Sequence, residues 1–280
     1  MHPLTLPEVL LTIHKLPSLP AVVLELLASM AQDDAPIETL GKKIAQDQAL
    51  TAKSLRLANS SFYGMVQQVT TPQQAISVLG FRTIRCLVTT AALIGAAPNA
   101  NHAAFDSKMF WRHGIAAAVC AREIAHYLGC NAEFAYTAAL LHDIGRLVVV
   151  TQFPLHFDAI LAFLSEHRCT PVQAEQAILG MDHTVVGHAL TQHWKFPLAL
   201  QQAVASHHTL PAPGEDALTT TVRQANVLAH ALDSTLEDDC AQTDVVVALG
   251  AALELEGGAW IALIARIKKN FAGASLVLNA

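Results

Sequence analysis

The ten residues from Thr137 to Arg146, TAALLHDIGR, place two polar side chains next to each other inside an apolar run. Burying His142 and Asp143 there is costly unless both find a partner. A metal ion is the simplest partner for an imidazole beside a carboxylate. Because two ligands hold a metal poorly, the fold must bring further ligands to this point from other segments of the chain.

Apolar residues recur at helical spacing along most of the sequence, and no stretch alternates every two residues, so the chain is predicted to be all-α. Proline, glycine and short polar residues mark the helix ends. In the first hundred residues, helices are expected over Ala21–Gln32, Pro36–Ile44, Asp47 to about Asn59, Thr71–Gly80 and Phe81–Ala96. Beyond residue 100 they are expected over Phe105–Leu128, Ala132–Thr151, His156–Glu166, Thr170–Gly180, Asp182–His193, Leu198–His208 and Leu218–Leu232, with two more at the end.

The turn-rich segment Pro98–Asn101 divides these helices into two groups that differ in charge. Residues 1–100 contain 7 Lys and Arg against 6 Asp and Glu, whereas residues 101–280 contain 10 against 17 and hold 12 of the 14 histidines. We therefore expect an N-terminal helical subdomain, residues 1–100, packed on a multi-helix bundle, residues 101–280. The histidine-rich bundle is the part suited to metal.

The composition, with 52% hydrophobic and 14% charged residues, indicates buried helices rather than disorder. The formal charge of −6 gives no general attraction to nucleic acid or to an anionic membrane. The five cysteines form no C-x-x-C pair and are expected to be small buried residues in a reducing compartment. The N-terminus lacks the basic region of a signal peptide, and the apolar run Cys86–Ala97 is too short to span a membrane. We expect a soluble, cytoplasmic protein.

Candidate metal ligands lie on separate predicted helices, so a bundle could point them all toward one site, as helical metal proteins do. Imidazole together with carboxylate suits Zn, Fe, Mn or Ni and fits Ca poorly. The candidates are His113, His142, Asp143, His183, His207, His208 and Asn226.

The LHDIG motif at 141–145, with a histidine upstream and histidines downstream, resembles the HD superfamily of metal-dependent phosphohydrolases. The first half narrows this resemblance to the HDOD (HD-related output domain) family, through LPSLP at 16–20, IAQDQAL at 44–50, LRLAN at 55–59 and AISVLGF at 75–81. The resemblance covers roughly residues 10–235. It implies an all-helical, HD-like bundle that serves mostly as a bacterial signalling or output module, in a family where many members have lost metal ligands.

The resemblance also implies a divalent metal, such as Fe, Mn, Ni, Zn or Mg, at the candidate ligands. Asn226 stands where HD enzymes have their last aspartate, and a neutral amide in place of a carboxylate is expected to weaken the binding of a hard cation. Arg146 stands where the related HD-GYP phosphodiesterases have a lysine that faces phosphate, and arginine can hold phosphate with two hydrogen bonds. If the chain is catalytic, His142, Asp143 and Arg146 are expected to carry the reaction.

Simpler interpretations of these residues stay open. His142 and Asp143 would then form a buried hydrogen bond that joins two helices, and Asn226 would be an ordinary hydrogen-bonding residue. Adjacent helical side chains point apart, so only one of His207 and His208 is expected to be a ligand.

Basic residues of the first half are expected to lie on solvated helix faces, with a docking surface for a partner as the alternative. They are Lys53, Arg56, Arg82 and Arg85. Binding of DNA by a helix-turn-helix is not expected, because this half is nearly neutral and lacks a strongly basic footprint.

The sequence thus predicts an HDOD-type signalling module with a partly retained HD metal pocket, which recognises a partner protein or a phosphate-containing, nucleotide-type ligand. The first alternative is an active phosphohydrolase, in which one or two metal ions supply a hydroxide that attacks phosphorus while Arg146 steadies the phosphate. The second alternative is a structural scaffold with an empty pocket. Neither membrane nor nucleic acid is expected as a partner.

Overall fold

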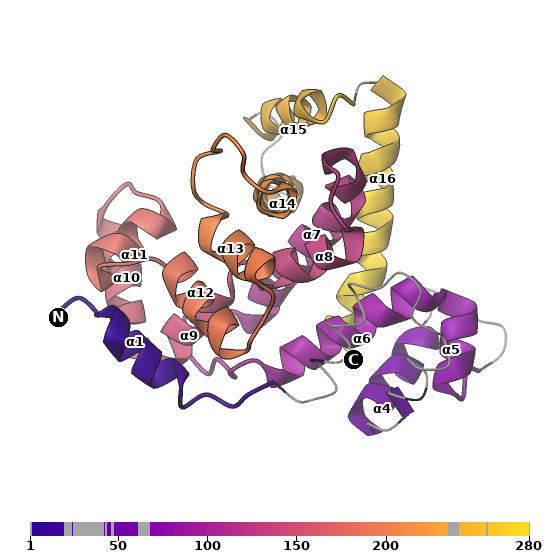
Figure 1. The fold of residues 1–280 in the computed structure, drawn as a ribbon, viewed down its shortest axis with the longest axis horizontal. Helices are drawn as coiled ribbons and strands as arrows, with labels where there is room; N and C mark the ends of the chain where they lie inside the picture. The colour runs from indigo at the N-terminus through magenta and orange to yellow at the C-terminus, as the bar shows by residue number, and fades with distance from the viewer. Residues whose placement is uncertain are drawn as a thin grey trace.

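The computed structural model describes residues 2–19, 24, 42, 44–45, 48–60, 68–234, 241–255 and 257–279, and these form helices without any β-strand (Figure 1). The predicted all-α class is confirmed. The elements, in chain order, are α1 (Leu6–Ile13), α4 (Gln48–Ala58), α5 (Pro72–Leu79), α6 (Phe81–Ala96), α7 (Ser107–Ile124), the 3₁₀ turn η1 (Ala125–Leu128), α8 (Ala132–Leu141), α9 (Ile144–Gln152), α10 (Pro154–Glu166), α11 (Pro171–Leu179), α12 (His183–His193), α13 (Leu198–Ser206), α14 (Ala217–Ser234), α15 (Ala241–Ala252), α16 (Gly257–Ala274) and the 3₁₀ turn η2 (Ser275–Asn279).

Local sequence explains many helix ends. Thr71 and Thr170 cap α5 and α11, each through a reciprocal capping box and with proline in the first turn. Gly180 ends α11 with a φ of 74°, a left-handed conformation that glycine adopts without strain. The expected helices over Ala21–Gln32 and Pro36–Ile44 fall almost entirely outside the described residues.

The first helix, α1, is an element that the sequence analysis missed. Its eight residues are too few for a clear periodic pattern, but Thr5 and Glu8 form a capping box at its start. The helix lies against α12, and the N–H of Leu4 donates to the carbonyl of Leu179 at 2.9 Å. The start of the chain therefore packs on the histidine-rich bundle.

The expected continuous helix over Ala132–Thr151 is wrong, because the chain forms two helices, α8 and α9, on either side of His142 and Asp143. The Nδ1–H of His142 donates to the Ala139 carbonyl at 2.6 Å, so the side chain satisfies a carbonyl in the last turn of α8. Taken together, Ala132–Gln152 is long and apolar enough to cross a membrane, but 83% of the tested window is buried inside the fold. We therefore read it as core. The expected helix over Phe105–Leu128 likewise changes to η1 after Ile124.

The centre of the molecule is formed by α7, α8 and α14, which pack on one another (Figure 1). Helix α7 presents small residues to α8, and a Cβ on Gly114 would lie only 3.1 Å from the carbonyl oxygen of Leu140. This close approach brings His113, beside Gly114, to His142 at the end of α8, with 5.3 Å between the ring centroids.

The helices α4, α5 and α6 form a group beside this centre, and α6 joins the two by packing on α8 and η2. Arg85 of α6 is only 1% exposed, and its guanidinium lies 3.6 Å from the carboxylate of Glu133 on α8. The expectation that Arg85 is solvated is therefore wrong, whereas Arg56 and Arg82 are exposed as expected. The division of the chain at residue 100 stays a prediction.

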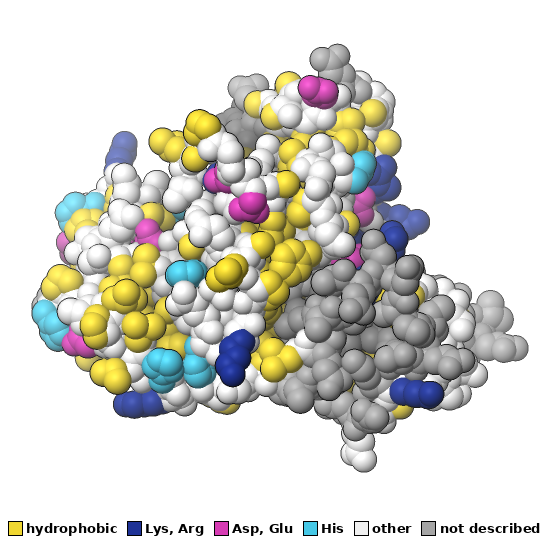
Figure 2. All heavy atoms as spheres, viewed as in Figure 1, with side chains coloured by type: hydrophobic (Ala, Val, Ile, Leu, Met, Phe, Trp, Pro, Cys, Tyr) yellow, Lys and Arg dark blue, Asp and Glu magenta, His cyan; other side chains and the backbone are white. Residues whose placement is uncertain are grey.

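One face of the molecule carries scattered charges. On the described residues of this face, Lys, Arg, Asp and Glu appear as separate spots among apolar side chains and several histidines (Figure 2). No continuous basic stripe crosses that described surface, which is the footprint that nucleic-acid binding would require.

Helices α9 and α12 cross with their backbones almost in contact. A Cβ on Gly145 would lie 2.0 Å from the carbonyl oxygen of His183 and 2.6 Å from the nitrogen of Gly187. No side chain fits between such close backbones. The crossing therefore fixes His183, the first residue of α12, beside the α8–α9 turn.

Gly145→Ala is expected to lower the free energy of unfolding by at least about 3 kcal/mol, because the added methyl group must push α12 away from α9. The matched control is Gly95→Ala, also within a helix, where the new Cβ would meet only Lys53 Nζ at 3.9 Å. That control is expected to be neutral or stabilising by up to about 1 kcal/mol. Urea unfolding measures both, and equal effects would contradict the close crossing.

Candidate metal centre

The turn between α8 and α9 holds His142 and Asp143 at the meeting point of four helices. His142 keeps helical backbone angles, whereas Asp143 departs from them (φ −95°, ψ 9°) and precedes the first residue of α9. Asp143 contacts His183 at the start of α12, and the ring of His142 lies 4.9 Å from that of His207, which follows α13. The break in the helix thus places the polar pair between α12 and α13.

One carboxylate oxygen, Oδ1 of Asp143, is surrounded by imidazole nitrogens. The Nε2 atoms of His183, His207 and His142 lie 3.0, 3.5 and 3.7 Å from it, and all four side chains are buried. The Nε2 atoms of His183 and His207 are themselves 3.3 Å apart. Asp143 Oδ1 thus has imidazole nitrogens from three separate segments within 3.7 Å. The candidate ligand atoms of Asp143, His183, His207 and His208 all lie within 4.8 Å of one another.

The other nitrogen of each ring is held by an acceptor. Nδ1 of His142 and of His207 donate to the carbonyls of Ala139 and Val204, at 2.6 and 2.8 Å. Nδ1 of His183 lies 2.6 Å from the carboxylate of Glu175, which also accepts the N–H of His183. Because a carbonyl or carboxylate can only accept, each Nδ1 carries a proton, and a ring that has no second proton presents a bare Nε2.

A positive charge would stabilise the cluster, in which imidazole lone pairs lie beside the Asp143 carboxylate. Nε2 of His142 is buried and has no hydrogen-bond partner among the described residues. Burial, opposed by Asp143, lowers the pKa of His142 well below its usual value, so this ring stays neutral. Burial would lower the pKa of His183 as well, but Asp143 and Glu175 outweigh it and raise that pKa to about 9. Without metal, a proton on His183 supplies the missing charge.

A divalent metal fits the same place. Neighbouring ligands of a tetrahedral ion with bonds of about 2.0–2.1 Å lie about 3.3 Å apart, and the contacts around Asp143 Oδ1 span 3.0 to 3.7 Å. The pKa of Asp143 is held well below its usual range, since His142, His183 and Arg146 outweigh its burial, so the ligand is an anion. Three imidazoles and a carboxylate suit Zn, Fe, Mn or Ni better than Mg.

A second group of candidate ligands shares Asp143 and includes His113 and His142. Here Nε2 of His113 lies 3.0 Å from Oδ1 of Asn226, and His230 stacks on His113 with 4.2 Å between ring centroids. An amide oxygen accepts, so this nitrogen of His113 carries a proton. In the second group, His113 is therefore already hydrogen-bonded to a neutral amide, unlike the imidazoles around Asp143 Oδ1.

A cavity of about 500 Å³ opens beside the cluster. Its wall includes Arg146, whose Nη1 lies 3.2 Å from Oδ2 of Asp143 and whose side chain is 37% exposed. His208 also lines it and is exposed, with a pKa lowered to about 4 by burial of its ring atoms and by His207 and His183. At neutral pH the cavity therefore offers the guanidinium of Arg146, the neutral ring of His208 and the side of the candidate metal centre.

All the candidate ligands taken from the sequence lie in this region, and their roles as ligands stay predictions. His207 is buried and His208 is exposed, but their rings lie 4.2 Å apart and both belong to one group of candidate ligands, so the expectation that only one of them is a ligand stays a prediction. Two residues were missed. Glu175 lies eight positions before His183, and nothing in the sequence pairs them. His230 lies four residues after Asn226, in the segment QANVLAH at 224–230, and hence on the same helix face.

A model of the HDOD domain matches residues 16–210. The chain belongs to the HDOD domain family. A Shewanella amazonensis SB2B structure, provisionally named a phosphohydrolase, is 28% identical with a TM-score of 0.76, over 96% of this chain and 97% of that one. A Marinobacter aquaeolei VT8 structure, provisionally named a signal transduction protein, is 22% identical with a TM-score of 0.73, over 95% of this chain and 60% of that one, and shows the fold alone.

A curated relative, an uncharacterized protein of Treponema pallidum (strain Nichols), is 26% identical over 225 residues. The match covers 79% of this HDOD chain and 43% of the Treponema protein, so the chain spans less than half the length of that relative. The family and the helical HDOD fold are thus shown, together with a His and Asp cluster suited to metal.

Asp143→Ala is expected to lower the affinity for Mn²⁺ or Zn²⁺ by more than about 100-fold, because Asp143 is the anionic centre of the cluster. Glu175→Ala, which removes only the acceptor that orients His183, should lower it about 10- to 100-fold. His188→Ala, on the same helix as His183, is the control and should change nothing. Competition with a chelating dye measures all three, and equal affinities would exclude the cluster as a metal site.

Metal binding is expected to release about one proton per ion at pH 8. The folded-state pKa of His183 is raised to about 9, so the ring is protonated at pH 8 and must lose that proton to become a ligand. Affinity should therefore rise about tenfold per pH unit up to about pH 9 and level off above it. Calorimetry in buffers of different ionisation enthalpy counts the protons, and none released at pH 8 would contradict the assignment.

Proposed function

We propose that this chain is a bacterial, cytoplasmic HDOD signalling module whose HD pocket holds a divalent metal and recognises a phosphate-bearing, nucleotide-type ligand. The observation that carries the proposal is the convergence of three Nε2 atoms on Asp143 Oδ1, with Nε2 of His142 buried and unsatisfied among the described residues. Each ring is fixed through its Nδ1, which is the arrangement of metal-binding histidines.

The two groups of candidate metal-ligating residues differ, and this difference favours a protein that binds a phosphate-bearing ligand without hydrolysing it. The cluster around Asp143 Oδ1 has a carboxylate and bare imidazole nitrogens, whereas His113 in the second group is bonded to the neutral amide of Asn226. Asp143 is the only carboxylate in either group of candidate ligands among the described residues. A second ion would therefore be held poorly, and hydrolysis that relies on two ions would be slow.

The cavity supports a phosphate-bearing ligand. Its volume of about 500 Å³ lies within the range of small-molecule sites, which is about 300–1,000 Å³. Arg146 lies at its wall with part of its guanidinium exposed, and one N–H already donates to Asp143. The remaining donors can bind phosphate oxygens in the forked geometry that arginine provides.

A partner protein would distinguish the form of the module with an occupied pocket from the form with an empty one. The Marinobacter structure of the same fold bears a signal-transduction name, and its chain and that of the Treponema relative are longer than this one. Of the described cysteines, Cys86 and Cys120 are buried as expected, whereas Cys130 and Cys169 are only half-buried.

A second candidate function is metal-dependent phosphohydrolysis. It is favoured by the Shewanella structure, which shares 28% of its sequence with this chain and bears a phosphohydrolase name. A bound metal would supply an activated water for attack on phosphorus. In that case the residues of this chain act around the metal: His142, His183, His207 and Asp143 hold it, and Arg146 orients the phosphate.

Arg146→Gln is expected to weaken the binding of inorganic phosphate to the Mn²⁺-loaded protein about tenfold or more, because a charged hydrogen-bond donor is lost. Arg168→Gln, an exposed arginine between α10 and α11, is the matched control and should bind phosphate as the wild type does. Metal affinity should not fall in either variant, because the guanidinium that Arg146→Gln removes is a positive charge 3.2 Å from the Asp143 carboxylate. Calorimetric titration measures phosphate and metal separately.

Turnover separates the two candidate functions. With Mn²⁺, Fe²⁺ or Ni²⁺, the wild type is expected to hydrolyse bis-p-nitrophenyl phosphate no faster than His142→Ala. Hydrolysis that disappears in both His142→Ala and Asp143→Ala would instead establish a phosphohydrolase. Asn226→Asp restores a carboxylate to the second group and should raise the affinity for a second equivalent of metal; no change would place Asn226 outside the metal site.

A further inference from the structure

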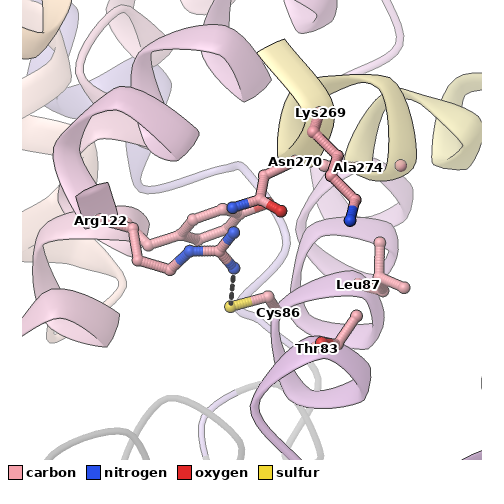
Figure 3. A pocket seen from close by; sticks show the side chains of 9 residues that line it. Thr83, Cys86, Leu87, Arg122, Lys269, Asn270 and Ala274 are labelled. Atoms are coloured by element: carbon pink, nitrogen blue, oxygen red, sulfur yellow. Dashed lines mark hydrogen bonds between the residues drawn. The ribbon is translucent and has the colours of Figure 1, made fainter. Parts of the chain in front are cut away.

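A second cavity, of about 450 Å³, lies between α6, the last of the N-terminal helices, and the helices of the bundle, including α16 (Figure 3). Its wall comes from α6, α7, α8 and α16, and it shares no lining residue with the cavity beside the metal centre. Around it, α6 packs on α8 while α16 packs on α7. The cavity therefore belongs to the junction between these helices.

Arg122 of α7 enters this cavity with most of its hydrogen-bonding capacity unused. Its Nη1 donates to the sulfur of Cys86 at 3.5 Å, and its guanidinium lies 5.4 Å from the ring centroid of Tyr136. Its Nε is 3.9 Å from a carboxylate oxygen of Glu123, which is too long for a hydrogen bond. A guanidinium has five N–H donors, and this one, with 20% of its side chain exposed, uses one of them on a thiol, so further donors are available to an anionic ligand.

Lys269 of α16 supplies a second positive charge to the same cavity. Its side chain extends toward the space that Arg122 also faces (Figure 3). Among the described residues it makes no hydrogen bond or ion pair. Two cations brought together without a carboxylate between them repel each other, and an anion placed between them would remove that repulsion.

The carboxylates closest to the cavity are already occupied. Glu133 is buried, lies 3.6 Å from Arg85 and accepts the thiol of Cys86 at 3.0 Å. Glu123 accepts from Arg266 and Asn270, at 3.1 and 2.8 Å. Neither acid lines the cavity, so its charged wall consists of Arg122 and Lys269 alone among the described residues.

Part of the remaining wall is apolar, beside the polar side chains of Thr83 and Asn270. Leu87, Ala274 and the ring of Tyr136 line it, and the hydroxyl of Tyr136 is bonded to Thr90 at 2.9 Å and is not free for a ligand. Burial and the negative charge of Glu133 raise the pKa of the Cys86 thiol to about 12, so this group stays neutral. A partly apolar space with two cations at its wall suits a molecule with an anionic head and an apolar body.

We propose that this junction cavity binds a small organic anion, whose carboxylate, phosphate or sulfonate group lies between Arg122 and Lys269 and whose apolar part contacts Leu87 and Tyr136. The site is independent of the metal centre and of the function proposed for it. Since α6 and α16 both contribute to its wall, a bound anion stabilises the junction between the N-terminal helices and the bundle.

The probes are 8-anilinonaphthalene-1-sulfonate and N-phenyl-1-naphthylamine, which share the same aromatic body but differ in the sulfonate. Fluorescence titration of the wild type is expected to give one site that prefers the sulfonate at least about tenfold over the neutral amine. In Lys269→Met this preference should fall at least about fivefold, with the affinity for the neutral probe unchanged. Lys268→Met removes the same charge from the next, exposed position of α16 and should match the wild type.

Several results would overturn the proposal. They are a wild type that binds the two probes equally or not at all, a Lys269→Met variant that keeps the full preference, and a Lys268→Met variant that loses it to the same extent. As a second measurement, the sulfonate should raise the Tm of the wild type and have less effect on Lys269→Met. Both lysines are exposed, so neither substitution is expected to disturb folding.

Discussion

The interaction on which the site depends is the contact of one carboxylate oxygen with three imidazoles. Asp143 is buried, and a buried carboxylate persists only if positive charge lies beside it. Here the charge is a proton on His183 in the metal-free protein, or a divalent ion. The attraction of the Asp143 carboxylate for a neighbouring positive charge therefore stabilises the metal-free fold through the proton on His183, and the same attraction gives the site its affinity for metal.

The backbone arrangement around Asp143 serves this contact. Small residues let α7 approach α8 and let α9 cross α12. The first close approach brings His113 to the second group of candidate ligands, and the second brings His183 to the cluster around Asp143 Oδ1. Acceptors on the rim of the cluster, two carbonyls and Glu175, then fix the ring tautomers. Glycine at 145 and 187 is therefore as much a requirement of the centre as the ligands.

Sequence reasoning recovered the helical class and selected residues that the fold brings together near Asp143, because both leave local signals. Apolar periodicity marks the helices, and histidines in otherwise apolar helices mark the site. It missed the break between α8 and α9, since an unbroken apolar run hides a turn that tertiary contacts impose. It placed Arg85 in solvent, because its partner Glu133 is 48 positions away and only the packing of α6 on α8 brings the two together. The junction cavity was equally out of reach, since Arg122 and Lys269 meet only through the packing of distant helices.

The crossing of α9 and α12 also determines which helices around the metal centre can move relative to one another. With backbone against backbone there is no side chain that could change rotamer, so Asp143 and His183 travel as a single rigid block. His113, His142 and His207 lie outside this crossing, on or beside α7, α8 and α13. A signal that changes the geometry of the metal centre must therefore move α7, α8 or α13 relative to α9 and α12. The histidines that move would be His113, His142 and His207, while His183 stays in contact with the Asp143 carboxylate.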